Sequence, residues 1–302
     1  MLRSGGFALA FAIAAAVAGA RPAASGEAAM APRPSPGCAA ANSATGNHLE
    51  RTIAVDGSER SYILDVPERL RPGTPVPLLL DFHGLGHSAA GVWKVSAFRD
   101  LAAADPFIAA YPDGLPVRFE RGSKTFEGKG WEIDRVDGNR DVKFVVALLD
   151  HLERTYCIDR ARVFATGFSN GAFLSHLLGC ALSDRFAAIA PVSGGRVPVP
   201  CNPPRGVPVL IQHGRQDPLI PPEDARAARD TWVATDQCHD RSDQGCERHL
   251  RCRDTAVVEY CEEDHAHRWP PQATKRVWDF LRAHPMPERT AEEAPLGDRG
   301  PY

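Results

Sequence analysis

Ser169 lies between two glycines in the segment Gly167-Phe168-Ser169-Asn170-Gly171. A strand-like run, RVFAT, precedes this motif, and a run with an apolar helical face follows it. A strand, a sharp turn and a helix together lift a serine hydroxyl off the end of a sheet, and the tight turn leaves room only for small residues on either side. The pattern predicts a nucleophilic serine. The alternative is a serine that merely begins a helix beside a glycine turn.

A serine hydroxyl becomes a useful nucleophile when a base takes its proton, and candidate partners follow in workable order. Asp217 comes just after the apolar run VPVLIQ, so we expect it on a loop where it can orient an imidazole. Taken alone, this aspartate is better explained as the start of the turn into Pro218. His265 and His267 follow the next predicted strand. The order serine, aspartate, histidine is the one expected of α/β-hydrolases.

Acyl transfer also requires backbone N–H donors for the oxygen that becomes negative. The amide of Asn170, directly after the serine, is one candidate. The loop HGLGHS follows the apolar run VPLLLDF, and from it we select the amide of Leu85 as the second donor. Gly84 and Gly86 would let the backbone approach the substrate, although each could equally be a turn residue without a chemical role.

Strand-like and helical segments alternate along the chain. Two segments of period two flank an Asp-Gly turn and predict an antiparallel hairpin, and an apolar stripe within 142–152 predicts an amphipathic crossover helix. Because parallel strands need crossover connections, the pattern predicts an α/β fold with a mostly parallel, doubly wound sheet and reactive groups at the carboxyl ends of its strands. The predicted strands are 51–55, 60–66, 76–82, 107–111, 162–167, 186–192, 207–212 and 255–261, and a closing helix lies near 273–284.

The composition is that of an ordinary globular domain. The 302 residues carry a formal net charge of -3, and 43% of them are hydrophobic. These values exclude the basic footprint of a nucleic-acid-binding protein and the low hydrophobicity of a disordered chain. We place the catalytic domain at residues 47–284, which leaves no room for a second large domain.

The first residues predict export. Residues 1–20 begin with an arginine, continue as an apolar run and end in small residues, which is typical of a signal peptide cleaved after Ala20. A membrane anchor is the alternative, but the run is short and rich in alanine. We expect residues 21–46 to form a flexible linker tied down at Cys38, and residues 285–302 to form a disordered tail.

All cysteines follow the predicted cleavage site. An even number of cysteines in an exported chain favours disulfides over metal thiolates. Zinc is the competing interpretation for the four cysteines nearest the carboxyl end, but no two of them have the close spacing of a zinc-binding pair. We therefore expect no metal. The eight residues are Cys38, Cys157, Cys180, Cys201, Cys238, Cys246, Cys252 and Cys261.

Segments spread over residues 37–284 carry a family resemblance. Taken in order and at compatible spacing, they resemble the secreted feruloyl esterases and polyhydroxybutyrate-depolymerase-like esterases, α/β-hydrolases of the carbohydrate esterase family 1 type. The segments are GC at 37–38, RSYILDVP at 60–67, FHGLGHSA at 82–89, YPDGLP at 111–116, GW at 130–131, DVKFVVALLDHL from 141, YCIDRARVFATGFSNGAF from 156, FAAIAPVSGG at 186–195, QHGRQD from 212 and HRWP at 267–270.

The resemblance implies a catalytic triad of Ser169, Asp217 and His267. It favours His267 over His265 because HRWP matches the family's histidine motif, and His265 beside acidic residues would then have a solvated, charge-paired role. The family usually has glycines before this histidine, so the acidic lead-in EED predicts a loop of a different shape. The resemblance also pairs Cys38 with Cys157, Cys180 with Cys201 and Cys238 with Cys252, which leaves Cys246 for Cys261.

By the same resemblance, the chain is a secreted serine carboxylic ester hydrolase that works through an acyl-enzyme and without a cofactor. We expect an ester partner, with feruloyl esters of plant cell-wall polysaccharide first and acetylxylan or polyhydroxybutyrate as alternatives. We expect no nucleic-acid partner, no membrane after signal cleavage, a monomer, and an extracellular or periplasmic location. Trp131 and Trp269 are candidates for the acyl pocket, and buried packing is the alternative. A non-catalytic exported binding protein would keep the fold and lack a triad residue.

Overall fold

The computed structural model describes residues 1–2, 30–39, 44–121 and 123–288. The predicted signal peptide, apart from its first two residues, lies outside these ranges, as do residues 21–29 and 40–43 of the predicted linker and residues 289–302 of the predicted tail. Within the described part of the chain, no helix is long and apolar enough to cross a bilayer.

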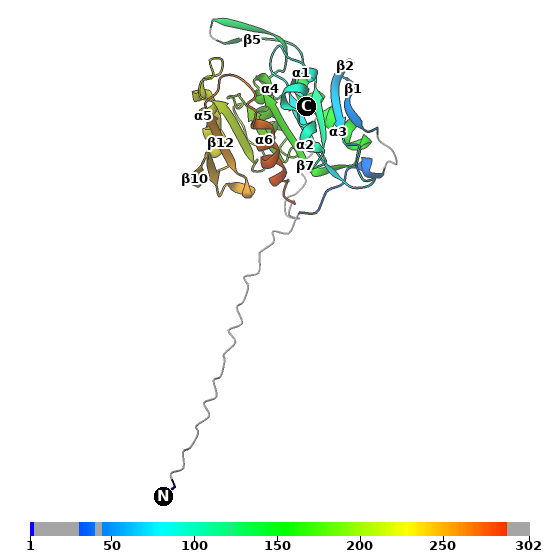
Figure 1. Ribbon diagram of the computed structural model, residues 1–302. Coiled ribbons are helices and arrows are strands. Elements are labelled where there is room, and N and C mark those ends of the chain that lie inside the picture. The colour runs from blue at the N-terminus through cyan, green and yellow to red at the C-terminus, as the bar shows by residue number, and fades with distance from the viewer. Residues whose placement is uncertain (3–29, 40–43, 122, 289–302) are drawn as a thin grey trace.

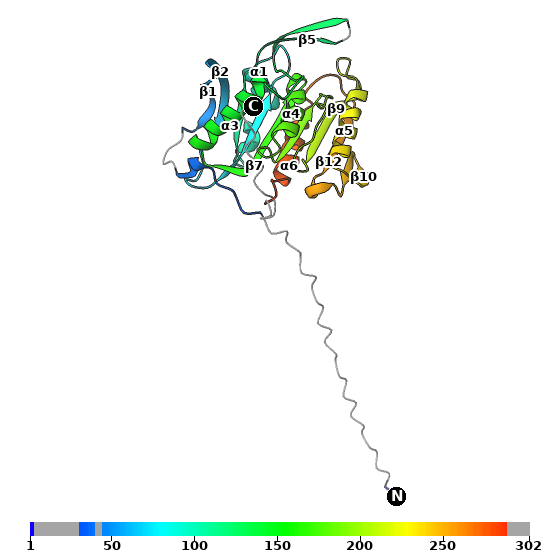
Figure 2. The ribbon, with the colours of Figure 1, turned by 180° about the vertical axis from the view of Figure 1, so that it is seen from behind.

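A ten-stranded sheet runs through the described residues (Figures 1 and 2). Its central strands, from β4 through β3, β7, β8 and β9 to β12, are parallel, and antiparallel strands flank them at both edges. The mostly parallel sheet is therefore confirmed. In spatial order the strands are β1 (Gly46–Val55), β2 (Ser58–Val66), β4 (Ile108–Pro112), β3 (Val76–Phe82), β7 (Ile158–Phe168), β8 (Ala188–Val192), β9 (Val209–Gly214), β12 (Val258–Glu263), β11 (Cys246–Leu250) and β10 (Asp240–Gln244).

Helices cover both faces of the sheet (Figures 1 and 2). Apolar side chains of α3, α4 and α5 belong to one buried core cluster, and those of α1, α2 and α6 belong to the other. This division is the doubly wound arrangement that the crossover pattern predicts. The helices are α1 (Ala89–Ser96), α2 (Arg99–Ala102), α3 (Arg140–Thr155), α4 (Asn170–Ala181), α5 (Pro222–Thr235) and α6 (Ala273–Ala283).

The amino-terminal hairpin forms as predicted. Val55 pairs with Ser58, so Asp56 and Gly57 form a two-residue loop between β1 and β2. Both loop residues have positive φ, 49° and 78°, which is the backbone that a tight hairpin needs to match the twist of its strands. The Asp-Gly pair is the sequence signal for this turn.

Two hairpins were not predicted. β5 (Leu115–Arg121) and β6 (Lys124–Gly130) pair with each other as a separate two-stranded sheet, and β10 and β11 add an antiparallel edge to the main sheet. The β5–β6 hairpin projects beyond the body of the molecule in both views (Figures 1 and 2). Its strands are largely polar, so their sequences lack the buried apolar run by which the other strands were recognised.

Four disulfides staple the domain. They join Cys38 to Cys157, Cys180 to Cys201, Cys238 to Cys252 and Cys246 to Cys261. The resemblance implies the first three pairs, and the fourth joins the two cysteines that remain. The first ties the chain ahead of β1 to the residue before β7, the third joins the residues that flank the β10–β11 hairpin, and the fourth ties β11 to β12.

The predicted linker is ordered before it reaches Cys38. Pro34 forms an antiparallel bridge with Asp159, and the amide of Ser35 donates to the carbonyl of Ile158 at 2.9 Å. A short 3-10 helix, Pro36–Ala39, follows. The prediction of flexibility up to Cys38 is therefore wrong for these residues, because backbone hydrogen bonds to β7 already fix them.

The predicted disordered tail begins too early. The side chain of Met286 is 5% exposed and belongs to the second core cluster, and its amide donates to the carbonyl of Ala161 at 2.8 Å. The guanidinium of Arg33 donates to the Met286 carbonyl. The prediction is wrong at Met286 because a buried apolar side chain and satisfied backbone groups hold it in place.

Candidate active site

The serine turn has the strained geometry that its glycines predict. Ser169 stands between the end of β7 and the start of α4 with φ 55° and ψ −115°, a conformation rarely adopted by a residue with a side chain. A Cβ atom on Gly167 would lie 2.6 Å from the carbonyl oxygen of Gly171, and one on Gly171 would lie 2.1 Å from the carbonyl oxygen of Phe82. Both positions therefore require glycine.

Asp217 and His267 meet at the carboxyl edge of the sheet. Nδ1 of His267 lies 2.7 Å from Oδ2 of Asp217. The other carboxylate oxygen, Oδ1, accepts from the amides of Leu219 and Ile220, both at 2.9 Å. The Asp217 side chain is fully buried, so these bonds fix both of its oxygens in the orientation that holds the imidazole.

The loops after β9 and β12 are fastened to each other by their backbones. The amide of Arg215 donates to the carbonyl of Glu263 at 2.8 Å, and the amide of Gln216 donates to the carbonyl of His265 at 3.2 Å. A Cβ atom on Gly214 would lie 2.2 Å from that same His265 carbonyl oxygen, so only glycine allows this approach. These contacts explain how residues 50 positions apart come together.

The acidic segment 262–264 precedes the histidine loop where the resembling family usually has glycines. Arginine side chains hold this segment in place. Two nitrogens of the Arg226 guanidinium donate to the Glu262 carboxylate, at 2.9 and 2.7 Å. These hydrogen bonds lower the pKa of Glu262 to about 2. Arg215 contacts both Glu262 and Asp264. The charged segment is therefore fixed by ion pairs at the edge of the site.

His265 takes a different environment from the one predicted. It is 4% exposed, and its Nδ1 lies 2.8 Å from the carbonyl oxygen of Ala266. The expectation of a solvated side chain is wrong, because the close approach of Gly214 buries the ring. The structure brings His267, and not His265, to Asp217.

Ser169 and His267 line the same cavity, whose volume is about 490 Å³. Apolar side chains make up most of its wall, and a few polar side chains stand among them. Such a cavity suits a small organic ligand held in orientation by few polar groups. The apolar residues are Leu85, Phe119, Phe126, Ile133, Phe168, Phe173, Leu219 and Ile220, and the polar side chains are Ser169, Asn170, His267, His87, Glu120, Arg196 and Asp224.

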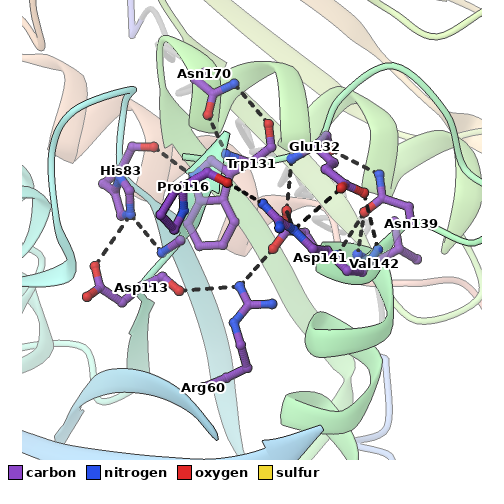
Figure 3. A network of polar contacts seen from close by, with 12 residues as sticks. Arg60, His83, Asp113, Pro116, Trp131, Glu132, Asn139, Asp141, Val142 and Asn170 are labelled. Atoms are coloured by element: carbon purple, nitrogen blue, oxygen red, sulfur yellow. Dashed lines mark hydrogen bonds and ion pairs between the residues drawn. The ribbon is translucent and has the colours of Figure 1, made fainter. Parts of the chain in front are cut away.

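Leu85 and Asn170, the predicted oxyanion donors, both line this cavity. Among the hydrogen bonds of the described residues, none runs from the backbone amide of either residue. The side chain of Asn170 makes a two-way contact with Trp131: its Oδ1 accepts from the Trp131 amide at 2.7 Å, and its Nδ2 donates to the Trp131 carbonyl at 3.3 Å (Figure 3). This contact anchors the first turn of α4 beside the serine.

A buried network behind the cavity supports the Leu85 loop (Figure 3). The indole of Trp131 donates to the His83 carbonyl at 2.8 Å, and the amide of Gly114 donates to Nε2 of His83 at 2.9 Å. Because Nε2 accepts, the proton sits on Nδ1, which lies 2.7 Å from the Gly84 carbonyl. Burial lowers the pKa of His83 to about 4, so the ring is neutral at neutral pH.

The two tryptophans do not line the cavity. The Trp131 side chain is 1% exposed and packs edge-on against Phe82. Trp269 is 9% exposed, lies in the second core cluster and donates to the Thr274 hydroxyl at 3.0 Å. The prediction that they form the acyl pocket is wrong, because each indole is held in packing with its N–H satisfied inside the protein.

His213 was not predicted as part of the site. Its ring is fully buried, with Nε2 2.9 Å from the Ile220 carbonyl and 3.7 Å from Oδ2 of Asp217. Burial lowers its pKa. A neutral ring that donates from Nε2 helps to hold the turn that carries Asp217. The signal was present in the segment HGRQD, where this histidine lies four residues before the aspartate.

The sequence profile of the phospholipase/carboxylesterase family matches residues 71–247, more than half of the chain. The chain belongs to this family. The matched range holds the serine turn and Asp217, and it ends before the histidine loop. The predicted fold is confirmed by a solved structure, an acetyl xylan esterase from Aspergillus awamori, with a TM-score of 0.60 over 78% of this chain and 99% of that chain. At 14% identity, this likeness concerns the fold alone.

Two relatives of this chain are named for ester-hydrolysing activities. Feruloyl esterase C of Emericella nidulans is 27% identical over 180 residues, which are 59% of this chain and 63% of that protein. A bifunctional acetylxylan esterase/xylanase of Neocallimastix patriciarum is 27% identical over 164 residues, 54% of this chain and 22% of that protein. The chain therefore matches less than two thirds of the length of each.

Proposed function

We propose that this member of the phospholipase/carboxylesterase family is a serine carboxylic ester hydrolase with Ser169 as nucleophile, His267 as general base and Asp217 as orienting acid. The observation that carries the proposal is the 2.7 Å contact between Nδ1 of His267 and Asp217, made by a histidine that shares a cavity with Ser169. The contact leaves Nε2 of the imidazole as the nitrogen that accepts the serine proton.

The reaction then proceeds through an acyl-enzyme. His267 takes the proton of Ser169 while the serine oxygen attacks the ester carbonyl, and the amides of Leu85 and Asn170 stabilise the negative oxygen. The tetrahedral intermediate collapses when His267 gives its proton to the leaving alcohol. A water molecule, deprotonated by the same histidine, attacks the acyl-enzyme and releases the free acid. No step of this scheme routes through a metal or a cofactor.

The first candidate substrate is a feruloyl ester of plant cell-wall polysaccharide. Four phenylalanines line the cavity beside Ser169, and aromatic side chains suit an aromatic acyl group. The relative from Emericella nidulans is named a feruloyl esterase. An acetyl ester of xylan is the second candidate, favoured by the relative from Neocallimastix patriciarum.

We also propose that the protein works outside the cytoplasm, as a monomer that contacts neither nucleic acid nor a membrane after loss of its signal peptide. The four disulfides support export, because such bonds persist in oxidising compartments. Mass spectrometry of the protein recovered from the medium and from the cell fractions of its natural host tests the export. Protein found only in the cytoplasm, with Met1 as its first residue, would contradict it.

The catalytic proposal is tested with Ser169→Ala and a panel of methyl ferulate, p-nitrophenyl acetate, p-nitrophenyl butyrate and polyhydroxybutyrate film. We expect the substitution to lower kcat by roughly 10⁴-fold or more, with an unchanged melting temperature, because it removes one hydroxyl oxygen and leaves the glycines of the turn. A serine-directed phosphonate should label Ser169 and no other serine. Near-normal turnover by Ser169→Ala would overturn the mechanism, and clearing of the film without ferulate release would overturn the substrate.

A further inference from the structure

The β5–β6 hairpin presents two aromatic rings on one of its faces. Phe119 and Phe126 are direct cross-strand partners, with ring centroids 5.4 Å apart and ring planes 14° from parallel. Strand alternation places Val117 and Gly128, the next pair on this face, between the rings and the base of the hairpin. The opposite face carries Arg118, Glu120, Thr125 and Glu127, all exposed, and of these only Glu120 also lines the cavity.

The aromatic face borders the candidate active site. Phe119 and Phe126 line the cavity that also holds Ser169 and His267, and both rings are only half-buried. A cross-strand aromatic pair also stabilises a hairpin, which supplies an alternative reason for their presence. Hairpin stability alone does not explain why both rings line the cavity and do not lie on the other face of the hairpin.

The base of the hairpin is fixed to the loop of the predicted oxyanion donor. The amide of Gly86 donates to the Lys129 carbonyl at 2.8 Å, and the Lys129 ammonium lies 2.7 Å from the Asp113 carboxylate. A Cβ atom on Gly130 would lie 3.0 Å from the Leu85 side chain, so the two segments are in close contact. The aromatic pair therefore keeps a defined position relative to the reacting groups, although its strands stand outside the main sheet.

We propose that Phe119 and Phe126 form an aromatic platform that binds a flat ring of the ester substrate and sets the preference for aromatic over short aliphatic esters. This inference rests on the proposed esterase function. A ring stacked against the pair loses its hydration and gains contact area that an acetyl or ethyl group cannot supply. The platform is thus a specificity element supplied by a hairpin outside the main sheet.

The test compares three esters that differ in where they carry a ring. Methyl ferulate has its ring in the acyl group, phenyl acetate has it in the alcohol, and ethyl acetate has none. The variants are Phe119→Leu, Phe126→Leu and the double variant, which keep apolar side chains on the strands and remove the rings. Glu127→Gln, on the exposed opposite face of the same hairpin, is the matched control.

We expect the double variant to lose about tenfold in kcat/KM on the ester whose ring occupies the platform, and less than about threefold on ethyl acetate. Loss on methyl ferulate alone assigns the platform to the acyl group, and loss on phenyl acetate alone assigns it to the alcohol. An equal loss on all three esters, or no loss on any, overturns the platform. Wild-type protein that hydrolyses none of the three overturns the esterase function itself, and melting curves identify a variant whose hairpin change unfolds the domain.

Discussion

The loops after β7, β9 and β12 and the β5–β6 hairpin border one cavity, but they hold their side chains by different means. The loops end buried parallel strands, and the Asp217 carboxylate they position is fully buried with both oxygens bonded. The two strands of the hairpin pair only with each other, its cavity-facing rings are half-buried, and its charged side chains at 118, 120, 124, 127 and 129 are exposed. One region is fixed by the sheet, and the other is attached to it at the base.

This difference matches what each region is proposed to do. Proton transfer and nucleophilic attack depend on distances of a few tenths of an ångström, so their groups need buried, fully bonded supports. Selection of a flat ring depends on contact area, which tolerates small movements of the contacting side chains. A two-stranded hairpin, marginal as an isolated structure, is adequate for the second task and not for the first.

The largest expected effect lies in the fixed region. We expect His267→Ala to lower kcat by several orders of magnitude, because it removes the only imidazole that contacts Asp217 through its Nδ1 among the described residues. We expect His265→Ala to cost no more than about tenfold, since the His265 ring is buried away from the cavity. Steady-state kinetics on p-nitrophenyl acetate measure both.

The paired design controls for folding. His265→Ala also removes a buried ring from the same loop, so it reports how much activity is lost by disturbing the loop alone. The reverse order of the two losses would make His265 the base. It would also remove the contrast between the regions, because the group nearest Asp217 would then not be the group that reacts.

The sequence predicts the fixed region well because its elements have local causes. The apolar run of β3 and the amphipathic stripe of α3 are signals of burial. The serine turn is signalled by two glycines at positions where a Cβ atom would clash with neighbouring backbone. Which of the two histidines contacts Asp217 depends on the tertiary structure. Local spacing does not distinguish His265 from His267, and the motif HRWP was needed to choose.

The hairpin escaped prediction for the opposite reason. Its two strands, LPVRFER and KTFEGKG, mix charged residues with a few apolar ones and with glycine and proline. Such a composition is equally typical of a surface loop. Large aromatic residues suit binding sites, which favours Trp131 and Trp269 as cavity residues, but burial and satisfied indoles place both in the interior. The aromatic residues that do line the cavity on this side, Phe119 and Phe126, lie in a segment whose sequence predicts no strand.

A second prediction asks whether the two regions are independent. Gly130 ends β6 where the hairpin meets the site, and a Cβ atom there would lie 2.7 Å from Oδ1 of Asn170 and 3.0 Å from the Leu85 side chain. We expect Gly130→Ala to lower kcat about tenfold to a hundredfold on every ester, because it displaces the groups beside both predicted oxyanion donors. Kinetics on methyl ferulate and ethyl acetate measure the effect.

Gly91 is the matched control for this substitution. It lies in α1, and the nearest atoms to an added Cβ would be at ordinary contact distances, 3.6 and 4.0 Å. We expect Gly91→Ala to leave kcat within about twofold of wild type. A loss confined to methyl ferulate in Gly130→Ala would show that the junction acts on ring binding alone, and the separation between the two regions would then be sharper than the contacts suggest.

The smallest effect concerns Asp81 on β3, the strand whose end carries the loop that both regions contact. Its side chain is fully buried, and neither carboxyl oxygen has a hydrogen-bond partner among the described residues, since the nearby Ser96 hydroxyl donates to the Val92 carbonyl. Burial raises the pKa of Asp81 from an ordinary value of 3.8 to about 7. Burial also raises the pKa of Tyr111 well above its usual value, so this neighbour does not titrate in the same range.

The sign of the pH dependence follows from where the proton is held. Between pH 3.8 and about 7 the unfolded chain has lost the Asp81 proton while the folded protein keeps it, so this residue lowers the stability of the wild-type protein as the pH rises, and the loss is complete above pH 7. Asp81→Asn removes the titration and nearly preserves the shape. We therefore expect the melting temperature of the variant, measured relative to wild type at pH 5, 6, 7 and 8, to increase by a few degrees up to pH 7 and then to stay level. A difference that does not change with pH would mean that Asp81 is ionised inside the protein, and the strand beneath the site would then carry a buried charge whose partner has yet to be found.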